Sequence, residues 1–193
     1  MLPEDDPSGE ACLKGTIVKL IDDDNAQIQV EGAKEPKNYR GDKIYPLNNY
    51  KDYPDGYDDM VDMENLSEAE LLNNLRIRFL QDMIYTYVGP TLIVANPYKR
   101  IEKLLKPEIL SNFHKRLLAG NFEQKENMPH VYAISATTMR NMFENYKNQA
   151  IVISGESGAG KTENTKSAMK FLTSLGNLPS VCILTNLPPY RQI

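Results

Sequence analysis

The chain has 193 residues, of which 41% are hydrophobic and 25% charged, with 11 glycines and 12 prolines. This composition is typical of a globular protein, and it excludes collagen, a coiled coil and wholesale disorder. The net charge of −4 is too small to argue for nucleic acid as a partner, and we expect none.

Charge is distributed unevenly along the chain. Residues 1–65 carry 7 basic and 16 acidic side chains, whereas residues 66–193 carry 15 and 10. This change of sign predicts two modules with different surroundings.

The two cysteines and the N-terminal residues indicate the compartment. Cys12 and Cys182 lie far apart and in no CxxC or Cys/His spacing, so the sequence supports neither a disulfide framework nor a zinc site. The first residues lack the basic region and apolar core of a signal peptide. No apolar run approaches the ~20 residues of a membrane span. We therefore expect a cytoplasmic chain with no membrane span.

Residues 1–50 are predicted to form a small β-barrel. Strands are expected over 14–21, 26–30 and 43–47, where alternating or β-branched residues are separated by turn residues. The turn at Asp22-Asp23-Asp24 lacks the glycine and the final glutamate of a calcium loop. Residues 51–65 are rich in Asp, Tyr, Pro and Gly and are expected to be a linker.

The next elements are a helix and a strand pair. Ser67 and Glu70 match a capping box, which predicts a helix start. The expected apolar face of this helix is Leu71, Leu72, Leu75 and Phe79. Strands over 83–88 and 91–95 flank Gly89-Pro90, which indicates a tight connection.

Two further helices and a buried strand follow. Pro107 is typical of a first helical turn, and the apolar spacing then continues to Gly120 on Ile109, Leu110, Phe113 and Leu117. A second helix is expected over 130–146. The continuous apolar run at 150–153 predicts a strand buried on both faces. His114 and His130 are expected to be helix-surface residues, and Lys99, Arg100, Lys103 and Lys106 a solvated face.

The residues after the apolar run satisfy the phosphate-loop pattern GxxxxGK[ST]. They read Gly155-Glu156-Ser157-Gly158-Ala159-Gly160-Lys161-Thr162. Glycines allow the backbone N–H groups to wrap a polyphosphate, and a following helix points its positive end at the same charge. Lys161 supplies a cation for the β- and γ-phosphates, and the Thr162 hydroxyl is a Mg²⁺ ligand in this pattern.

The flanking pattern supports this interpretation over a chance match. A helix over about 161–175 is expected, with Met169, Leu172 and Leu175 as its inward stripe and Gly176 at its end. An accidental match in a chain of this size has odds on the order of one in a hundred, given glycine at roughly 7% of residues. The sequence therefore predicts nucleotide binding.

Four segments, in register and in order, resemble the myosin motor head. They are the loop continued as Glu163-Asn164-Thr165-Lys166, the run from Tyr85 to Lys99, the run from Pro129 to Ile134, and the run from Leu66 to Arg78. Residues 12–47 are similar to the Src-homology-like barrel that precedes many myosin heads. The resemblance covers about 12–177. It implies an ATP-binding part of an actin-based motor, located in the cytoplasm at the cytoskeleton in a myosin complex.

The resemblance also assigns residues to a nucleotide site. Asn96, Pro97, Tyr98 and Lys99 would lie near the adenine and ribose, although Asn96-Pro97 alone is typical of a strand end. The loop 155–162, with Asn164 just beyond it, would hold the phosphates of ATP, and Thr162 the Mg²⁺. Leu104 stands where the family usually has a tyrosine near the base, so the base pocket is expected to differ.

The sequence departs from the family pattern beyond Asn177. Residues 178–193 match no family segment, and the last acidic side chain of the sequence is Glu163. Hydrolysis by a phosphate-loop enzyme normally needs a second carboxylate to hold Mg²⁺. The two γ-phosphate-sensing loops and the actin-binding surface of the family are expected to be absent, so no catalytic residue is assigned.

These observations lead to one fold and two functions. The expected fold is α/β, with a Src-homology-like β-barrel at 1–50, a linker at 51–65, an incomplete phosphate-loop motor core at 66–177 and a divergent tail at 178–193. The expected function is that of an ATP-binding N-terminal fragment of an actin-based motor. The alternative is a truncated nucleotide-binding or interaction fragment without ATPase or motor activity.

Overall fold

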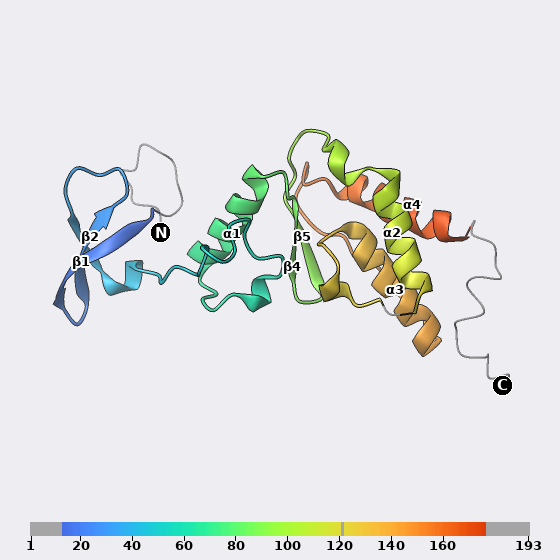
Figure 1. The fold of residues 1–193 in the computed structure, drawn as a ribbon, viewed down its shortest axis with the longest axis horizontal. Coiled ribbons are helices and arrows are strands. Elements are labelled where there is room, and N and C mark those ends of the chain that lie inside the picture. The colour runs from blue at the N-terminus through green and yellow to red at the C-terminus, as the bar shows by residue number, and fades with distance from the viewer. Residues whose placement is uncertain (1–12, 121, 177–193) are drawn as a thin grey trace.

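A computed structural model describes residues 13–120 and 122–176 of the chain. Figure 1 shows a small sheet at one end, helix α1 (Glu68–Leu80) in the middle, and helices α2 (Pro107–Leu118), α3 (Val131–Asn145) and α4 (Lys161–Gly176) at the other end. Short 3-10 helices lie at Gly41–Lys43, Met60–Asp62, Glu102–Leu104 and Gln124–Glu126. Cys12, Cys182 and the predicted tail at 178–193 lie outside the described residues.

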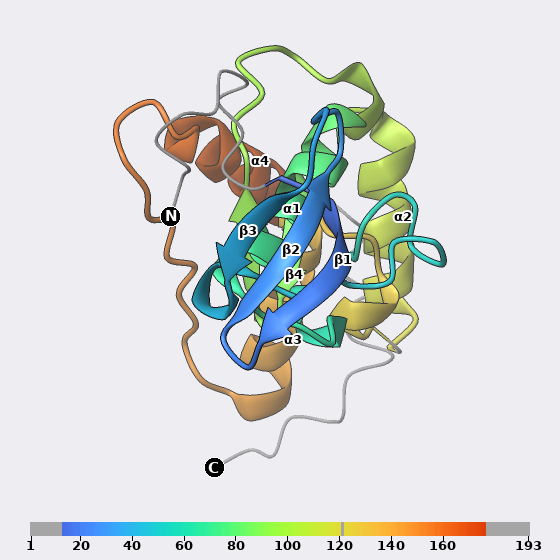
Figure 2. The same ribbon diagram turned by 90° about the vertical axis from the view of Figure 1, so that its left-hand side faces the viewer.

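The N-terminal module is an antiparallel sheet in the order β1-β2-β3, seen face-on in Figure 2. Its strands are β1 (Gly15–Asp22), β2 (Asn25–Val30) and β3 (Lys37–Arg40). The third strand is not the predicted 43–47, because Lys37–Arg40 pairs with Asn25–Ile28 and Gly41 N–H then donates to Asp24 O. Every residue of β1 is exposed. The described strands form an open sheet, and the expected closed barrel is not confirmed.

The segment expected to be a linker contributes to a small core. Tyr57, Met60 and Met63 are buried and pack against Leu71, Leu75, Val88 and Ile93. The rings of Tyr53 and Tyr57 stack with centroids 4.1 Å apart. This part of 51–65 is therefore held against α1 and the strand pair by apolar contact.

Helix α1 begins as predicted but buries a polar face. Ser67 Oγ accepts from Glu70 N–H, which is one half of the expected capping box. The buried side chains are those of Glu70, Asn74 and Arg78, whereas Leu72 and Phe79 are exposed. The predicted apolar face is therefore confirmed for Leu71 and Leu75, which pack against the small core, and wrong for Leu72 and Phe79. The polar groups are buried because they bind the preceding segment: Asn74 accepts from Tyr57 N–H at 2.7 Å and Glu70 accepts from Asn48 N–H at 2.8 Å.

The strand pair is formed as predicted. Strands β4 (Tyr85–Val88) and β5 (Thr91–Val94) pair in antiparallel register, with Tyr85 opposite Val94 and Val88 opposite Thr91. Gly89 has a φ of 56°, which the tight connection requires. A parallel bridge between Asp59 and Tyr87 adds the 51–65 segment to the outer side of β4.

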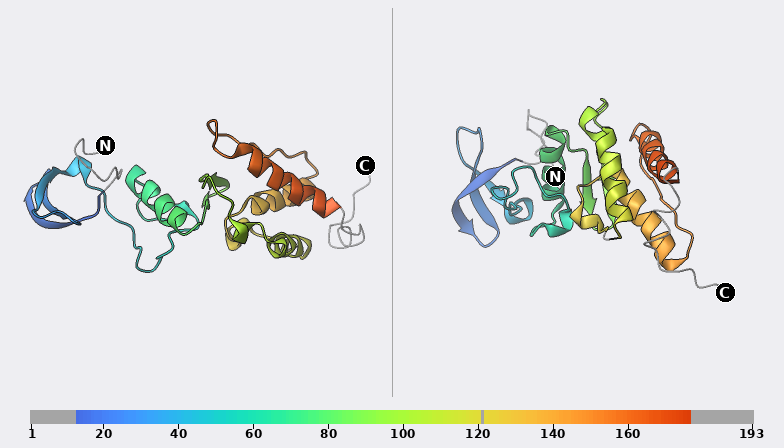
Figure 3. Two further views of the ribbon diagram at one scale, coloured as in Figure 1. Left: turned by 90° about the horizontal axis from the view of Figure 1, so that it is seen from above. Right: turned by 45° about the vertical axis from the view of Figure 1, so that its right-hand side comes forward.

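Helices α2, α3 and α4 pack beside this strand pair and enclose the main core. Helix α3 contacts both α2 and α4, as Figure 3 shows from two directions. The core has Tyr87, Phe122, Tyr132 and Phe171 among its most completely buried side chains. The predicted face of α2 is confirmed, since Phe113 is buried and Ile109, Leu110 and Leu117 pack against the same core.

Near the phosphate loop, the predicted strand was wrong and the predicted stripe of α4 was wrong for Met169 alone. Residues 150–153 are not assigned as a strand, and Val152 is 87% exposed, because no described strand lies beside this segment to pair with it. On α4 the buried stripe is Ala168, Phe171 and Leu175, with Leu172 partly buried, whereas Met169 is 56% exposed. Spacing of three and four residues selects that stripe, and Met169 falls on its flank.

Among the described residues, no helix is long and apolar enough to cross a membrane.

Candidate functional site

The candidate site is formed where the loop 155–160 meets the loop 96–99 that follows β5. Gly158 and Gly160 have φ values of 80° and 90°, a backbone region that side-chain-bearing residues rarely adopt. A Cβ on Gly158 would lie 3.8 Å from the Tyr98 hydroxyl, and one on Gly160 3.8 Å from Asn96 Cγ. An added Cβ would make only ordinary contacts at these distances, so the positive φ values are what require glycine at both positions.

Asn96 joins the two loops through hydrogen bonds. Its Nδ2 donates to Gly158 O at 2.6 Å, and its Oδ1 accepts from Tyr98 N–H at 3.0 Å. The same amide therefore fixes both its own loop and the phosphate loop. Tyr98 has a positive φ of 49° and a side chain that is 84% exposed, next to Gly158.

Lys161, the first residue of α4, binds two carbonyl groups at the start of the loop. Its ammonium donates to Gly155 O and Glu156 O, both at 2.8 Å. Ala159 N–H donates to Glu156 O at 3.2 Å within the loop. Lysine has three N–H donors, so two of them are used by these carbonyls. The result is a cation placed at the loop and the positive end of a helix at the same point.

The first turn of α4 continues the site. Thr162 is exposed there, and Glu163 forms an exposed ion pair with Lys166 at 2.7 Å. Asn164 Nδ2 donates to Gly160 O at 3.0 Å, and Asn164 Oδ1 accepts from the Tyr85 hydroxyl at 3.2 Å. The phosphate loop is thus connected to β4 as well as to the loop after β5.

Lys99 is directed to the other side of its loop. Its ammonium pairs with Asp82 Oδ1 at 2.6 Å, and this hydrogen bond holds the pKa of the Asp82 carboxyl below its usual value. Lys99 and the other three basic residues predicted as a solvated face are all exposed. The structure brings Asn96 and Tyr98 to the phosphate loop, whereas the ammonium of Lys99 is paired with Asp82.

An open groove of about 810 Å³ extends from the phosphate loop along α4. It is lined by Lys161, Thr162 and Ile153 near the loop and by Thr165, Lys166, Met169, Lys170 and Thr173 farther along the helix. The groove is therefore basic and hydroxyl-rich, with Met169 and Ile153 as its apolar members. No group of three or more His, Cys, Asp or Glu side chains that could hold a metal ion exists among the described residues.

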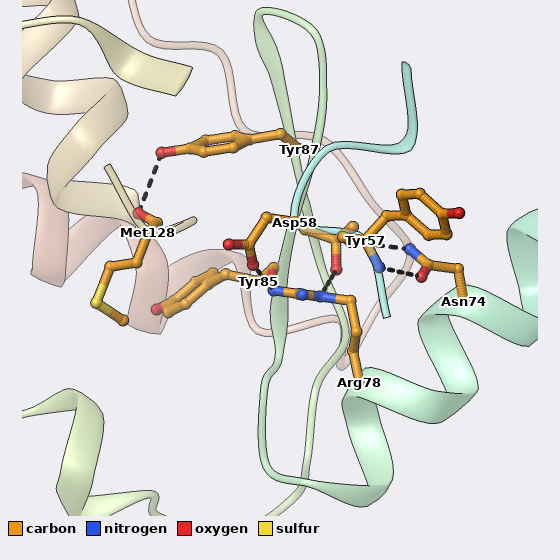
Figure 4. A network of polar contacts seen from close by, with 8 residues as sticks. Tyr57, Asp58, Asn74, Arg78, Tyr85, Tyr87 and Met128 are labelled. Carbon is orange, nitrogen blue, oxygen red and sulfur yellow. Dashed lines mark hydrogen bonds and ion pairs between the residues drawn. The ribbon is translucent and has the colours of Figure 1, made fainter. Parts of the chain in front are cut away.

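A buried polar network supports the strand pair behind the site (Figure 4). Arg78 is 3% exposed; its guanidinium pairs with Asp58 at 2.7 Å and donates to Thr86 Oγ1 and Tyr85 O, both at 2.9 Å. The Tyr87 hydroxyl donates to Met128 O at 3.2 Å. Sequence reasoning missed this network. The sequence feature that could have revealed it is the i, i+4, i+8 spacing of Glu70, Asn74 and Arg78, which puts three polar side chains on one helix face.

Both histidines are buried, which corrects the expectation that they lie on helix surfaces. His130 Nδ1 caps α3 by accepting from Tyr132 N–H at 3.1 Å, so Nε2 carries the proton and donates to Leu104 O at 3.3 Å. Desolvation by burial lowers the pKa of His130 to about 4. His114 Nε2 lies 3.2 Å from Phe171 O, and burial also lowers its pKa. Each histidine links two segments that enclose the core.

Comparison of the sequence with known proteins finds relatives in one family. A family model described as myosin head (motor domain) matches residues 57–183. "Myosin-2" of Arabidopsis thaliana is 38% identical over 152 residues, which are 74% of this chain and 12% of that protein. "Myosin-M heavy chain" of Dictyostelium discoideum is 41% identical over 132 residues, 68% of this chain and 7% of that protein. "Myosin-2 heavy chain, non muscle" of Acanthamoeba castellanii is 36% identical over 171 residues, 88% of this chain and 11% of that protein. The chain thus spans roughly a tenth of the length of the curated relatives it matches.

Proposed function

The chain belongs to the myosin head (motor domain) family, and from this premise we propose that its loops 155–162 and 96–99 bind ATP with Mg²⁺. The observation that carries the proposal is the hydrogen bond from Asn96 to Gly158, which joins residues 62 positions apart. Neither the glycine pattern nor the Asn96-Pro97 strand end implies this contact alone. The two loops that would hold the base and the phosphates are therefore neighbours in space.

The chemistry of the loop fits a triphosphate. Backbone N–H groups in a glycine-rich turn, the positive end of α4 and the ammonium of Lys161 all favour negative charge at one place. Bringing a polyphosphate there would give Lys161 phosphate oxygens in place of carbonyl oxygens as acceptors. The open groove along α4 includes Lys161 and Thr162 in its lining, so a ligand in the groove could reach both residues.

Mg²⁺ would reach this site with the nucleotide. The hydroxyl of Thr162, on the first turn of α4, would hold it and is a hard oxygen ligand of the kind Mg²⁺ prefers. Mg²⁺ is usually bound by one or two protein groups and by substrate phosphates. The ion would neutralise phosphate charge, while Lys161 and the loop amides orient the phosphates.

The base would lie beside the loop 96–99. Tyr98 offers an exposed ring at this point, and the carbonyls and amides of the loop offer hydrogen-bond partners. Leu104, at the position where the family usually has a tyrosine, is 8% exposed and belongs to the main core. We therefore propose that the base of ATP meets Tyr98 and Pro97, with no contribution from Leu104.

We place this chain in the nucleotide-binding part of an actin-based motor, acting at the cytoskeleton in the cytoplasm. The relatives that it matches are myosins, and their longer chains would supply the actin-binding surface and the movement. Actin filaments are accordingly proposed as a partner of the complete motor.

A second function that we propose is nucleotide binding without turnover. Within the described residues 155–176 the only carboxylates are those of Glu156 and Glu163, both exposed, and phosphate-loop hydrolysis needs a carboxylate that organises Mg²⁺ and water. A steady-state ATPase assay with and without actin filaments separates the two functions. Mg²⁺-dependent turnover stimulated by actin would favour the motor for this sequence itself.

The binding proposal is tested by titrating the full chain with a fluorescent ATP analogue and Mg²⁺. Lys161→Ala should weaken binding more than tenfold, because the cation at the loop is lost. Lys115→Ala removes the same charge from the exposed surface of α2, outside the groove along α4, and should change the affinity less than twofold. Absence of saturable binding by the unaltered chain, or equal binding by the Lys161→Ala variant, would overturn the proposal.

A further inference from the structure

We propose that Tyr85 is a positioning residue for the phosphate loop: through Asn164, its hydroxyl fixes the peptide group between Gly160 and Lys161. Tyr85 lies on β4 and Asn164 on the first turn of α4, 79 positions away. The inference rests on the nucleotide function proposed above and adds a residue outside the loop to it.

The hydrogen bonds form a short relay with a defined direction. The Tyr85 hydroxyl donates to Asn164 Oδ1 at 3.2 Å. Because Oδ1 is then the acceptor, Nδ2 faces the loop and donates to Gly160 O at 3.0 Å. The backbone N–H of Asn164 donates to the same carbonyl at 3.1 Å. Without the hydroxyl, the Asn164 side-chain amide keeps only its hydrogen bond to Gly160 O, so its orientation is less firmly held.

Tyr85 is well held at the other end of the relay. Its side chain is 8% exposed, its ring lies 4.8 Å from that of His130, and its carbonyl accepts from Arg78 at 2.9 Å. Burial raises the pKa of the Tyr85 hydroxyl to about 12, so the hydroxyl keeps its proton. A fixed ring with a protonated hydroxyl gives a donor of constant position.

The peptide plane carries this constraint to the ligand side of the loop. A trans peptide places the carbonyl of one residue opposite the N–H of the next. Holding Gly160 O toward Asn164 therefore turns the N–H of Lys161 away from α4, toward the mouth of the loop. That N–H group belongs to the set that would face the phosphates, so its direction affects nucleotide affinity.

The experiment compares Tyr85→Phe with Tyr87→Phe in the full chain. The two tyrosines lie on the same face of β4, and Tyr87 also donates one hydrogen bond, but to Met128 O rather than to a residue of the phosphate loop or of α4. Each substitution removes one hydroxyl and one bond, so their effects on stability should be similar. Tyr85→Phe should weaken Mg·ATP binding about two- to tenfold, as expected for one hydrogen bond, whereas Tyr87→Phe should leave it unchanged.

Two further measurements keep the inference separate from the nucleotide proposal. In the nucleotide-free chain, Tyr85→Phe should speed hydrogen exchange of the backbone N–H of Asn164. The exchange rates of the backbone N–H groups of α3 should stay unchanged. With Asn164→Ala already present, adding Tyr85→Phe should cause no further loss of affinity. Equal affinity losses in Tyr85→Phe and Tyr87→Phe, or unchanged exchange at Asn164, would overturn the inference. Failure of the unaltered chain to bind Mg·ATP would overturn the nucleotide proposal instead, and the exchange result would still decide the role of Tyr85.

Discussion

The side chain of Asn96 and the backbone of Gly158 are joined by a 2.6 Å hydrogen bond across 62 positions of sequence. The same side chain accepts from Tyr98 N–H, so a single amide sets the conformation of one loop and its distance from another. Together with the bond from Tyr85 to Asn164, the Asn96 side chain thus connects the strand-pair region to the phosphate loop.

Asn96→Ala is expected to weaken Mg·ATP binding about fivefold to tenfold. The substitution removes both hydrogen bonds, and each contributes about 0.5–1.5 kcal/mol. Thermal unfolding should change little, because the Asn96–Gly158 bond is exposed. Arg100→Ala, on the same stretch and in an exposed ion pair, is the control and should leave affinity unchanged. Equal affinity of the unaltered chain and the Asn96→Ala variant in the fluorescence titration would contradict the role of this residue.

Gly160→Ala is expected to lower both stability and affinity. The φ of 90° is unfavourable for alanine and costs about 1–2 kcal/mol. Gly120→Ala is a matched control, because Gly120 has a φ of 79° with nothing within 4 Å of an added Cβ. Urea unfolding should show similar losses for both variants, whereas titration should show weaker Mg·ATP binding only for Gly160→Ala. Weaker binding in both would mean that the effect comes from general destabilisation.

Sequence reasoning succeeded where periodicity and turn residues act locally. The strand pair around Gly89, the helix that starts at Pro107 and the helix that follows the phosphate loop all have strong local signals. The site residues of the phosphate loop were predicted from signals of the same kind, since glycine spacing and a following helix are local features.

Long-range partners account for what sequence reasoning missed. Arg78 and Asn74 are buried because the 51–65 segment supplies their partners, and no local pattern identifies that segment. Tyr85 could be placed on a strand but could not be paired with Asn164, 79 positions away. The predicted strand at 150–153 needed a neighbouring strand, and burial inferred from composition alone cannot supply one.

Val152→Lys is expected to reduce self-association of the chain. Val152 is 87% exposed within an apolar run, and exposed apolar segments of high β-propensity favour aggregation. Light scattering against concentration should fall, and the melting temperature should change little because the side chain makes few buried contacts. Ser111→Lys adds the same charge on the exposed face of α2 and should have a smaller effect. Equal reductions in both variants would point to net charge as the cause.

Unfolding stability should fall as pH decreases from about 6.5 to about 4, and His130 should account for much of the fall. The folded protein holds the pKa of His130 at about 4, below the ordinary 6.5 of the unfolded chain. In this range the unfolded state binds more protons than the folded state, so acid favours unfolding. Above the ordinary pKa the histidine is neutral in both states and contributes no pH dependence.

The physical cause is the place of His130 at the start of α3. Protonation would put a proton on Nδ1, which accepts from Tyr132 N–H, and a positive charge at the positive end of the helix. The ring is packed between Tyr85 and Tyr132, so water cannot reach it without local opening. We expect a loss of about 2 kcal/mol between pH 7.5 and pH 5, using about 1.4 kcal/mol per pKa unit.

His130→Asn tests this cause directly. Asparagine can cap the helix with its side-chain oxygen but does not titrate, so the pH dependence of urea unfolding should become shallower. His114→Asn is the comparison, because burial also lowers the pKa of His114, and the fall caused by His130 should persist in that variant. An identical slope in the unaltered chain and the His130→Asn variant would show that other groups, chiefly carboxylates, produce the pH dependence.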